Sequence, residues 1–115
     1  MKEIIEKLRA FADERDWAQF HSPKNLAMAL SVEAAEIVEH FQWLTQAQSY
    51  RMDPDKVAAV RDEIGDVLIY LTMLADKLGI DPMRAALDKI EKNQKKYPAG
   101  IVRGQAKKYK EYKGK

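Results

Sequence analysis

The chain has 115 residues, of which 46% are apolar and 33% charged, and this suits one globular domain with a single core. It has no cysteine, which excludes disulfides, thiolate metal sites and a Cys nucleophile and agrees with a reducing compartment. No apolar run approaches the about 18 residues of a membrane span, and the first ten residues lack the apolar core of a signal peptide. We therefore expect a cytoplasmic protein without a membrane partner.

The net charge of +2 is unevenly distributed along the chain. Residues 103–115, RGQAKKYKEYKGK, hold six basic residues and one acidic residue, a balance of +5. The other 102 residues hold 14 basic and 17 acidic residues, a balance of −3. We expect a folded domain over residues 1–102 and a basic, flexible tail over 103–115. Binding of this tail to nucleic acid is the alternative.

Helical periodicity and proline define the expected elements in chain order. An apolar pattern predicts a first helix over residues 2–15. Three dipeptides then have the pattern of a helix start: Ser22-Pro23, Asp53-Pro54 and Asp81-Pro82. Ser and Asp are favoured N-caps, and Pro is favoured in the first turn because its missing N–H would have no partner there. We therefore expect further helices at about 24–45, 54–78 and 82–96.

Four helices joined by short connections predict an all-α protein, a four-helix bundle. Gly79 and Pro98 suit the ends of the third and fourth helices. Apolar residues at helical spacing define an expected core stripe on the second and third helices: Leu26, Leu30, Ile37, Phe41, Leu44, Val60, Ile64, Val67, Leu71, Leu74 and Leu78. Helices of this length bury little surface on their own, so we expect an oligomer.

Acidic residues interrupt the apolar pattern of the second helix. In SVEAAEIVEHFQW, residues 31–43, Glu33, Glu36 and Glu39 follow at three-residue steps. Neighbouring like charges on a helix destabilise it by a few tenths of a kcal/mol. The third helix carries a similar pair, Glu63 and Asp66, in RDEIGDVLIY. The acidic residues therefore either lie on the solvated edges of their helices or bind a positively charged group.

Both acidic pairs border the expected core. At about 100° per residue, Glu63, Asp66, Tyr70 and Lys77 fall within an arc of roughly 60° beside the apolar stripe. If the two helices pack antiparallel, the pairs meet at one edge, where the carboxylates would repel one another and raise their pKa values. A hard divalent ion such as Mg²⁺ would remove this repulsion. A di-iron site would need Glu-x-x-His, and His40 does not have that spacing.

The pattern E-x-x-E followed on the next helix by E-x-x-D resembles that of the MazG-like superfamily, the all-α nucleoside triphosphate pyrophosphohydrolases. Four flanking segments resemble its dCTP pyrophosphatase branch: RDWAQFHSPKNLAMAL, FQW, GDVLIYL and KIEKNQKKYP. The resemblance covers about residues 8–103. It implies a Mg²⁺-dependent enzyme that hydrolyses a nucleoside triphosphate, with dCTP or a modified dCTP expected, to the monophosphate and pyrophosphate. It also implies a homo-oligomer, with a tetramer favoured over a dimer.

The resemblance also implies roles for individual residues. The metal ligands, which form the catalytic centre, would be Glu33, Glu36, Glu63 and Asp66. The positions that match phosphate-contacting residues are Lys77, Lys89 and Asn93, with Tyr97 or Arg103 as further candidates. The base and sugar pocket would be formed by Trp17, His21, Asn25, Trp43 and Tyr70.

Each flanking residue also has a structural interpretation. Both tryptophans could fill a core or an interface. His21 could support the adjacent helix start, and Tyr70 could hydrogen-bond a neighbouring acid. The lysines could be surface residues, and Asn93 could belong to a fraying helix end. Glu39 turns away from the first pair, which favours an exposed position, although it could instead orient the attacking water. The alternative for the whole protein is a non-catalytic helical interaction module with a nucleic-acid-binding tail.

Overall fold

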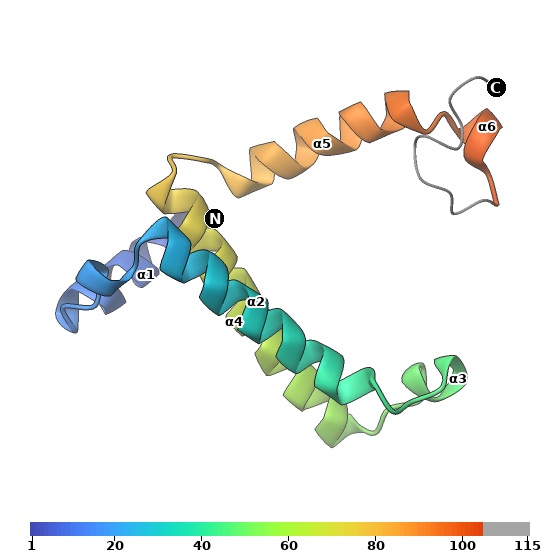
Figure 1. Cartoon of the computed structure of the whole chain (residues 1–115), viewed down its shortest axis with the longest axis horizontal. Coiled ribbons are helices and arrows are strands. Elements are labelled where there is room, and N and C mark those ends of the chain that lie inside the picture. Colours follow the sequence, from blue (N-terminus) through green and yellow to red (C-terminus); the bar gives the residue numbers. More distant parts are fainter. Residues whose placement is uncertain (105–115) are drawn as a thin grey trace. The chain divides into compact units, whose positions relative to one another are not determined.

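The computed structural model describes residues 1–104, so nearly all of the expected basic tail lies outside the described residues (Figure 1). The chain divides into two compact units, Met1–Ile80 and a second unit that begins at Asp81.

Helices account for all regular structure in residues 1–104, so the all-α prediction is confirmed. The first unit holds α1 (Lys2–Glu14), a 3₁₀ helix η1 (Ala18–Phe20), α2 (Pro23–Phe41), α3 (Gln46–Ser49) and α4 (Pro54–Lys77). The second unit holds α5 (Pro82–Lys96) and α6 (Ala99–Val102). Among these residues, no helix has both the length and the apolar character that crossing a membrane requires.

The helix starts follow the predicted chemistry. The Ser22 side chain accepts a hydrogen bond from the backbone N–H of Asn25 at 3.1 Å and caps α2. Asp53 caps α4 through the N–H of Lys56 at 2.9 Å, and Asp81 caps α5. These side chains satisfy backbone donors that have no partner inside the helix, which is why each helix begins at its proline.

The end of the second helix differs from the prediction. Instead of continuing to residue 45, α2 ends at Phe41, and the short helix α3 follows. Thr45 begins α3 because its hydroxyl accepts from the Gln48 N–H while the Gln48 side chain accepts from the Thr45 N–H. This reciprocal capping box stabilises a new helix start where the prediction had placed the last turn of the second helix.

α4 ends at Lys77, its C-cap is Leu78, and Gly79 follows with a positive φ of 67°, as expected for the end of this helix. The Ile80 N–H donates to the Ala75 carbonyl at 2.8 Å, and the Gly79 N–H donates to Asp76 at 3.2 Å. This is a Schellman motif, in which glycine takes the left-handed conformation without the steric cost of a Cβ.

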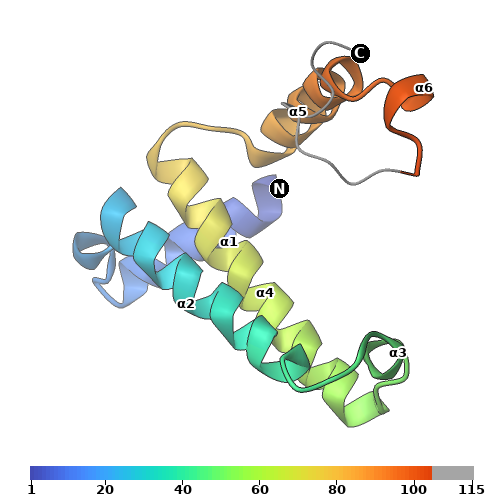
Figure 2. The same cartoon turned by 45° about the vertical axis from the view of Figure 1, so that its right-hand side comes forward.

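α2 and α4 lie side by side and run antiparallel, and they form the main helix pair of the first unit (Figures 1 and 2). α1 also packs on α4, where Arg9 makes a two-pronged ion pair with Asp76. Among residues whose burial the structure describes, the buried ones come from these three helices and are few and mostly small: Ala12, Leu26, Thr72 and Ala75.

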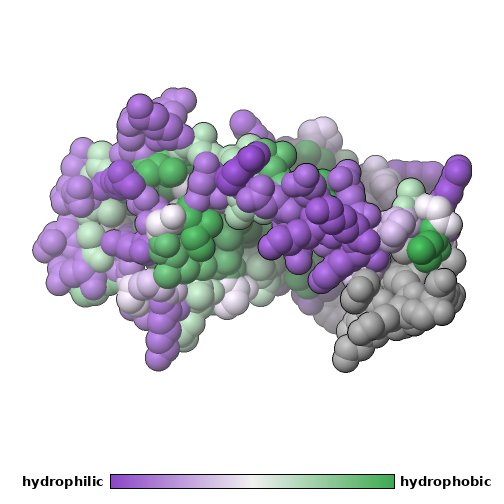
Figure 3. All heavy atoms as spheres, turned by 90° about the horizontal axis from the view of Figure 1, so that it is seen from above, coloured by the Kyte–Doolittle hydropathy of each residue, from purple (hydrophilic) through white to green (hydrophobic). Residues whose placement is uncertain are grey.

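Much of the expected core stripe is not buried within the chain, so that part of the prediction is wrong for the single chain. Of the stripe, only Leu26 is buried, at 1% exposure, whereas Ile64 and Leu78 are each 55% exposed. Figure 3 shows hydrophobic side chains, in green, lying at the surface. A helix pair has two apolar sides, and α2 and α4 cover only one side of each other. The remaining apolar surface therefore requires a further covering element.

Candidate active site

Three carboxylates converge where α2 and α4 face each other. Glu33 and Glu36 come from α2 and Glu63 comes from α4, and one oxygen of each lies within 4.8 Å of the others. All three side chains are half-buried. The antiparallel pairing brings the two acidic motifs to the same level along the helices. This arrangement could hold a metal ion, because hard divalent cations prefer clustered carboxylate oxygens.

Mutual repulsion and burial shift the titration of this cluster. The pKa of Glu33 is raised, mainly by burial and then by the neighbouring Glu36 carboxyl group. The pKa of Glu63 is also raised, mainly by its contact with Glu36 and then by burial. The Oε2 atoms of Glu33 and Glu63 are both buried without a hydrogen-bond partner. Buried oxygens that lack donors are costly, so the cluster suits a cation.

Asp66 stands slightly apart from the other three acids. Its side chain is exposed, and it does not belong to the group within 4.8 Å. Its charge nevertheless contributes to the raised pKa values of both Glu33 and Glu63. Glu39 is exposed.

His40 lies near one member of the cluster, Glu63, although it does not belong to the group within 4.8 Å and the sequence analysis gave it no role. Its Nε2 lies 3.9 Å from Oε1 of Glu63, and the two side chains are 20% and 22% exposed. The sequence did contain a signal, because residue 40 follows Glu36 by four positions and Glu33 by seven. Such residues share one face of a helix.

A cleft of about 290 Å³ lies between α1, the segment around η1, and α4, and Asp66 connects it to the cluster, because Asp66 lines the cleft and its charge acts on Glu33 and Glu63. Four of the expected site residues line it: Trp17, His21, Asp66 and Tyr70. The other lining residues are apolar: Leu8, Phe11, Ile69 and Met73. A cleft lined by aromatic and apolar side chains with a few polar groups is typical of a small-molecule site.

Trp17 is held by an aromatic contact that the sequence analysis missed. The Phe11 ring packs edge-on against Trp17, with centroids 5.7 Å apart and planes at 71°. The Arg15 guanidinium covers the Phe11 ring at 3.7 Å from its centroid. Trp17 keeps 46% of its surface exposed, so its ring remains available to a ligand. The spacing of six residues between the two rings was uninformative because the chain turns after α1.

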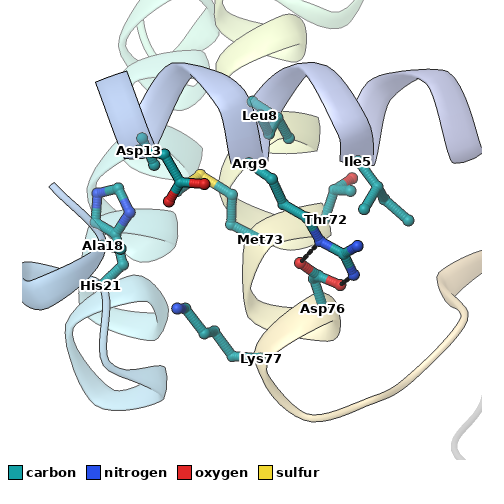
Figure 4. Close-up of a pocket in the computed structure, with 11 residues that line it drawn as sticks. Ile5, Leu8, Arg9, Asp13, Ala18, His21, Thr72, Met73, Asp76 and Lys77 are labelled. Atoms are coloured by element: carbon teal, nitrogen blue, oxygen red, sulfur yellow. Dashed lines mark hydrogen bonds and ion pairs between the residues drawn. The ribbon is translucent and has the colours of Figure 1, made fainter. Parts of the chain in front are cut away.

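A second, smaller cavity adjoins this cleft (Figure 4). The two share Leu8, His21 and Met73 as lining residues. Lys77 extends into the smaller cavity, and the Arg9–Asp76 ion pair forms its opposite side (Figure 4). This ion pair lowers the pKa of Asp76, because the guanidinium donates hydrogen bonds to the carboxylate.

The structure does not bring all the expected site residues to the cleft. The Asn25 side chain donates to the Phe20 carbonyl at 3.0 Å, so it supports the turn before α2. Trp43 lies beyond the end of α2, is 87% exposed, and does not line the cleft. Lys89 and Asn93 lie on α5 in the second unit, where both are exposed.

Comparison with known proteins identifies the family of this chain. Residues 28–112 match the MazG-like family model, and the chain therefore belongs to the MazG-like family.

Among individual relatives, the chain is similar to dCTP pyrophosphatase 1 of Rattus norvegicus, with 44% identity over 110 residues. It is also 44% identical over 112 residues to dCTP pyrophosphatase 1 of Homo sapiens. These matches cover 93% and 95% of this chain, which spans only 65% and 66% of the two relatives' lengths. A crystal structure of a pyrophosphatase from Archaeoglobus fulgidus is also similar. Its TM-score is 0.81 at 43% identity, with 85% of this chain and 92% of that chain covered.

The raised carboxyl pKa values predict how stability depends on pH. A raised pKa means that the folded chain holds the proton more tightly than the unfolded chain. Without a divalent ion, the free energy of unfolding should therefore fall as pH rises from about 4.5, the ordinary value, through the raised pKa. Glu33→Gln should melt at a higher temperature than the unsubstituted protein at pH 7, and the difference should vanish at acidic pH.

Thermal unfolding followed by circular dichroism in EDTA, from pH 4 to pH 8, measures this difference. Glu39→Gln is the matched control, because Glu39 is exposed on the same helix and should show no such pH-dependent gain. Equal melting temperatures for Glu33→Gln and the unsubstituted protein at every pH would contradict the repulsion inferred for the cluster.

Proposed function

We propose that the protein is a Mg²⁺-dependent nucleoside triphosphate pyrophosphohydrolase that acts in the cytoplasm on dCTP or a modified dCTP. The products are the nucleoside monophosphate and pyrophosphate, and the reaction removes unwanted nucleotides from the pool. The observation that carries the proposal is the convergence of Glu33, Glu36 and Glu63 beside an aromatic cleft. The identity of 44% to dCTP pyrophosphatases supports the choice of substrate.

In this proposal, Glu33, Glu36, Glu63 and Asp66 hold Mg²⁺. Their fit to a cation rests on the clustered oxygens and on the two buried Oε2 atoms without donors. When bound, the ion supplies positive charge to the triphosphate oxygens and lowers the pKa of water. The carboxylates fix the position of that charge, and no covalent nucleophile is required, in agreement with the lack of cysteine.

The cleft is suited to the nucleoside part of the substrate. Trp17 and Tyr70 present aromatic surface on which a base can stack, and His21 offers a ring nitrogen for a hydrogen bond. Asp66 lines the same cleft, and its charge contributes to the raised pKa of Glu33. In this proposal it therefore lies between the base pocket and the metal site. Lys77 is placed to balance phosphate charge next to the cleft.

Four other residues take part only as the family resemblance implies. We retain Lys89 and Asn93 as phosphate-contacting candidates and Trp43 as a base-contacting candidate. For Asn25, the hydrogen bond from its side chain to the Phe20 carbonyl favours a supporting role at the start of α2 over direct contact with substrate.

The proposed reaction and the bond that it breaks can be tested directly. Protein incubated with Mg²⁺ and a panel of nucleoside triphosphates that includes 5-methyl-dCTP should release monophosphate and pyrophosphate, most rapidly from dCTP-like members. Glu63→Gln should reduce this turnover by at least about a hundredfold, because it removes charge stabilisation from the reacting centre. Chromatography of the products measures both.

The matched control is Asp62→Asn, the exposed neighbour of Glu63, which should retain full turnover and the same helical spectrum. Absence of pyrophosphate across the whole panel, from a folded sample, would contradict the proposed activity. The alternative of a nucleic-acid-binding module would then gain support if RNA or DNA bound with steep salt dependence and lost binding on removal of residues 104–115.

The proposed role of the aromatic cleft in substrate binding can also be tested. Trp17→Ala should raise the KM for dCTP roughly tenfold or more, because stacking of a base on an aromatic ring contributes about 1–3 kcal/mol. Phe20→Ala is the control, since Phe20 is 61% exposed and does not line the cleft. Steady-state kinetics measure the change, and an unaltered KM for Trp17→Ala would exclude Trp17 from the substrate site.

We also propose that the protein is a homo-oligomer, with a tetramer favoured over a dimer. Several apolar side chains of α2 and α4 are exposed, including Val32, Val57 and Ile64. They support this assembly because exposing so much apolar surface to water is unfavourable, and contact with another chain would bury it. Light scattering should give a mass that is a multiple of the 13.2 kDa chain, four chains being expected. A stable species of one chain would contradict this assembly.

A further inference from the structure

The aromatic cleft lies between two helices, so its width depends on how α1 is placed against α4. Phe11 lines the cleft from α1, whereas Tyr70 and Met73 line it from α4. Trp17 follows α1, because its backbone N–H donates to the Ala12 carbonyl at 2.9 Å and its ring contacts the Phe11 ring. A shift of α1 would therefore move Phe11 and Trp17 together relative to the residues of α4.

Side chains do not fill the space between α1 and α4. Ala12 of α1 and Thr72 of α4 are buried and line the smaller cavity, but both have small side chains. The cavity has a volume of about 70 Å³. Close-packed side chains resist displacement, whereas unfilled space does not. Another contact therefore has to hold α1 in place.

The Arg9–Asp76 ion pair provides this contact (Figure 4). Nε of Arg9 donates to Oδ2 of Asp76 at 2.9 Å, and Nη2 of Arg9 donates to Oδ1. Paired hydrogen bonds between a planar guanidinium and a carboxylate fix orientation as well as distance. Arg9 follows Leu8 on α1, and Asp76 lies one turn after Met73 on α4. Because Leu8 and Met73 both line the cleft, the ion pair acts at its margin.

We propose that Arg9 and Asp76 are positioning residues for the substrate: their ion pair sets the separation of the cleft walls and thereby how tightly a nucleotide base is held. The proposal rests on the proposed function, because it takes the cleft as the nucleotide site. Neither residue lines the cleft or belongs to the carboxylate cluster. Loss of the ion pair should therefore weaken binding of the base and leave the reacting centre intact, which raises KM with little change in kcat.

Steady-state kinetics of the full-length protein with dCTP and Mg²⁺ test this proposal. Arg9→Met and Asp76→Asn should each raise KM at least about fivefold and change kcat by less than about twofold. The double variant should be no worse than either single variant, because both substitutions remove the same contact. Arg9→Lys keeps the charge but loses the paired geometry, and it should still raise KM at least about threefold.

Lys7→Met is the matched control. Lys7 lies on the same helix and pairs with Glu3 at 3.2 Å, but that ion pair stays within α1. Its loss should leave both KM and kcat unchanged.

A second readout requires no nucleotide. The chain holds two tryptophans, so in a Trp43→Phe background the fluorescence comes from Trp17 alone. Quenching by acrylamide then measures the exposure of the Trp17 ring. Arg9→Met in this background should increase the quenching, whereas Lys7→Met should not.

The outcomes separate this proposal from the proposed function. An unchanged KM in Arg9→Lys would overturn it even if Arg9→Met failed to fold, and so would a loss of kcat in place of the rise in KM. A raised KM in Arg9→Met with a normal KM in Asp76→Asn would also overturn it, because freed Asp76 would then be drawing away Lys77, whose charge already acts on it. Increased quenching in Arg9→Met, with no hydrolysis by the unsubstituted protein, would overturn the proposed function and leave the control of the cleft by the ion pair standing.

Discussion

The repulsion among carboxylates from α2 and α4 is the constraint on which the rest of the structure depends. The antiparallel pairing of these helices places Glu33, Glu36 and Glu63 together, half-buried and with raised pKa values for Glu33 and Glu63. In the absence of a cation this arrangement opposes folding, since like charges are being removed from water. The helix pair therefore has to be stabilised elsewhere, by its apolar contacts, by the caps at its ends and by α1.

The same two helices also expose apolar surface that is not covered within the chain. Few of the described residues are buried within the chain, while Ile64 and Leu78 remain half exposed. One edge of the pair thus needs a cation and another surface needs a covering partner. In the proposed enzyme, a bound metal ion and assembly into an oligomer would meet these two requirements, and each should then shift the stability of this helix pair.

Features that depend on interactions between residues close together in the sequence could be predicted, whereas features that depend on tertiary packing could not. The helix starts at Ser22, Asp53 and Asp81 depend on hydrogen bonds two or three residues along the chain, and they were predicted correctly. The capping box at Thr45 is equally local, but it was overlooked behind the apolar pattern of residues 31–44. The contacts of Phe11 with Trp17 and of His40 with Glu63 depend on how the chain turns and packs, and periodicity alone does not contain that information.

The position of Asp66 explains why metal and nucleotide binding should be interdependent in the proposed enzyme. Asp66 lines the aromatic cleft, and its charge is felt by both Glu33 and Glu63. A polyphosphate in that cleft would therefore meet several negative charges at short range, and without a cation its binding would be opposed. The aromatic walls can hold a base whether or not metal is present, but the phosphate end depends on the ion. Cation binding must accordingly precede or accompany productive binding of the triphosphate.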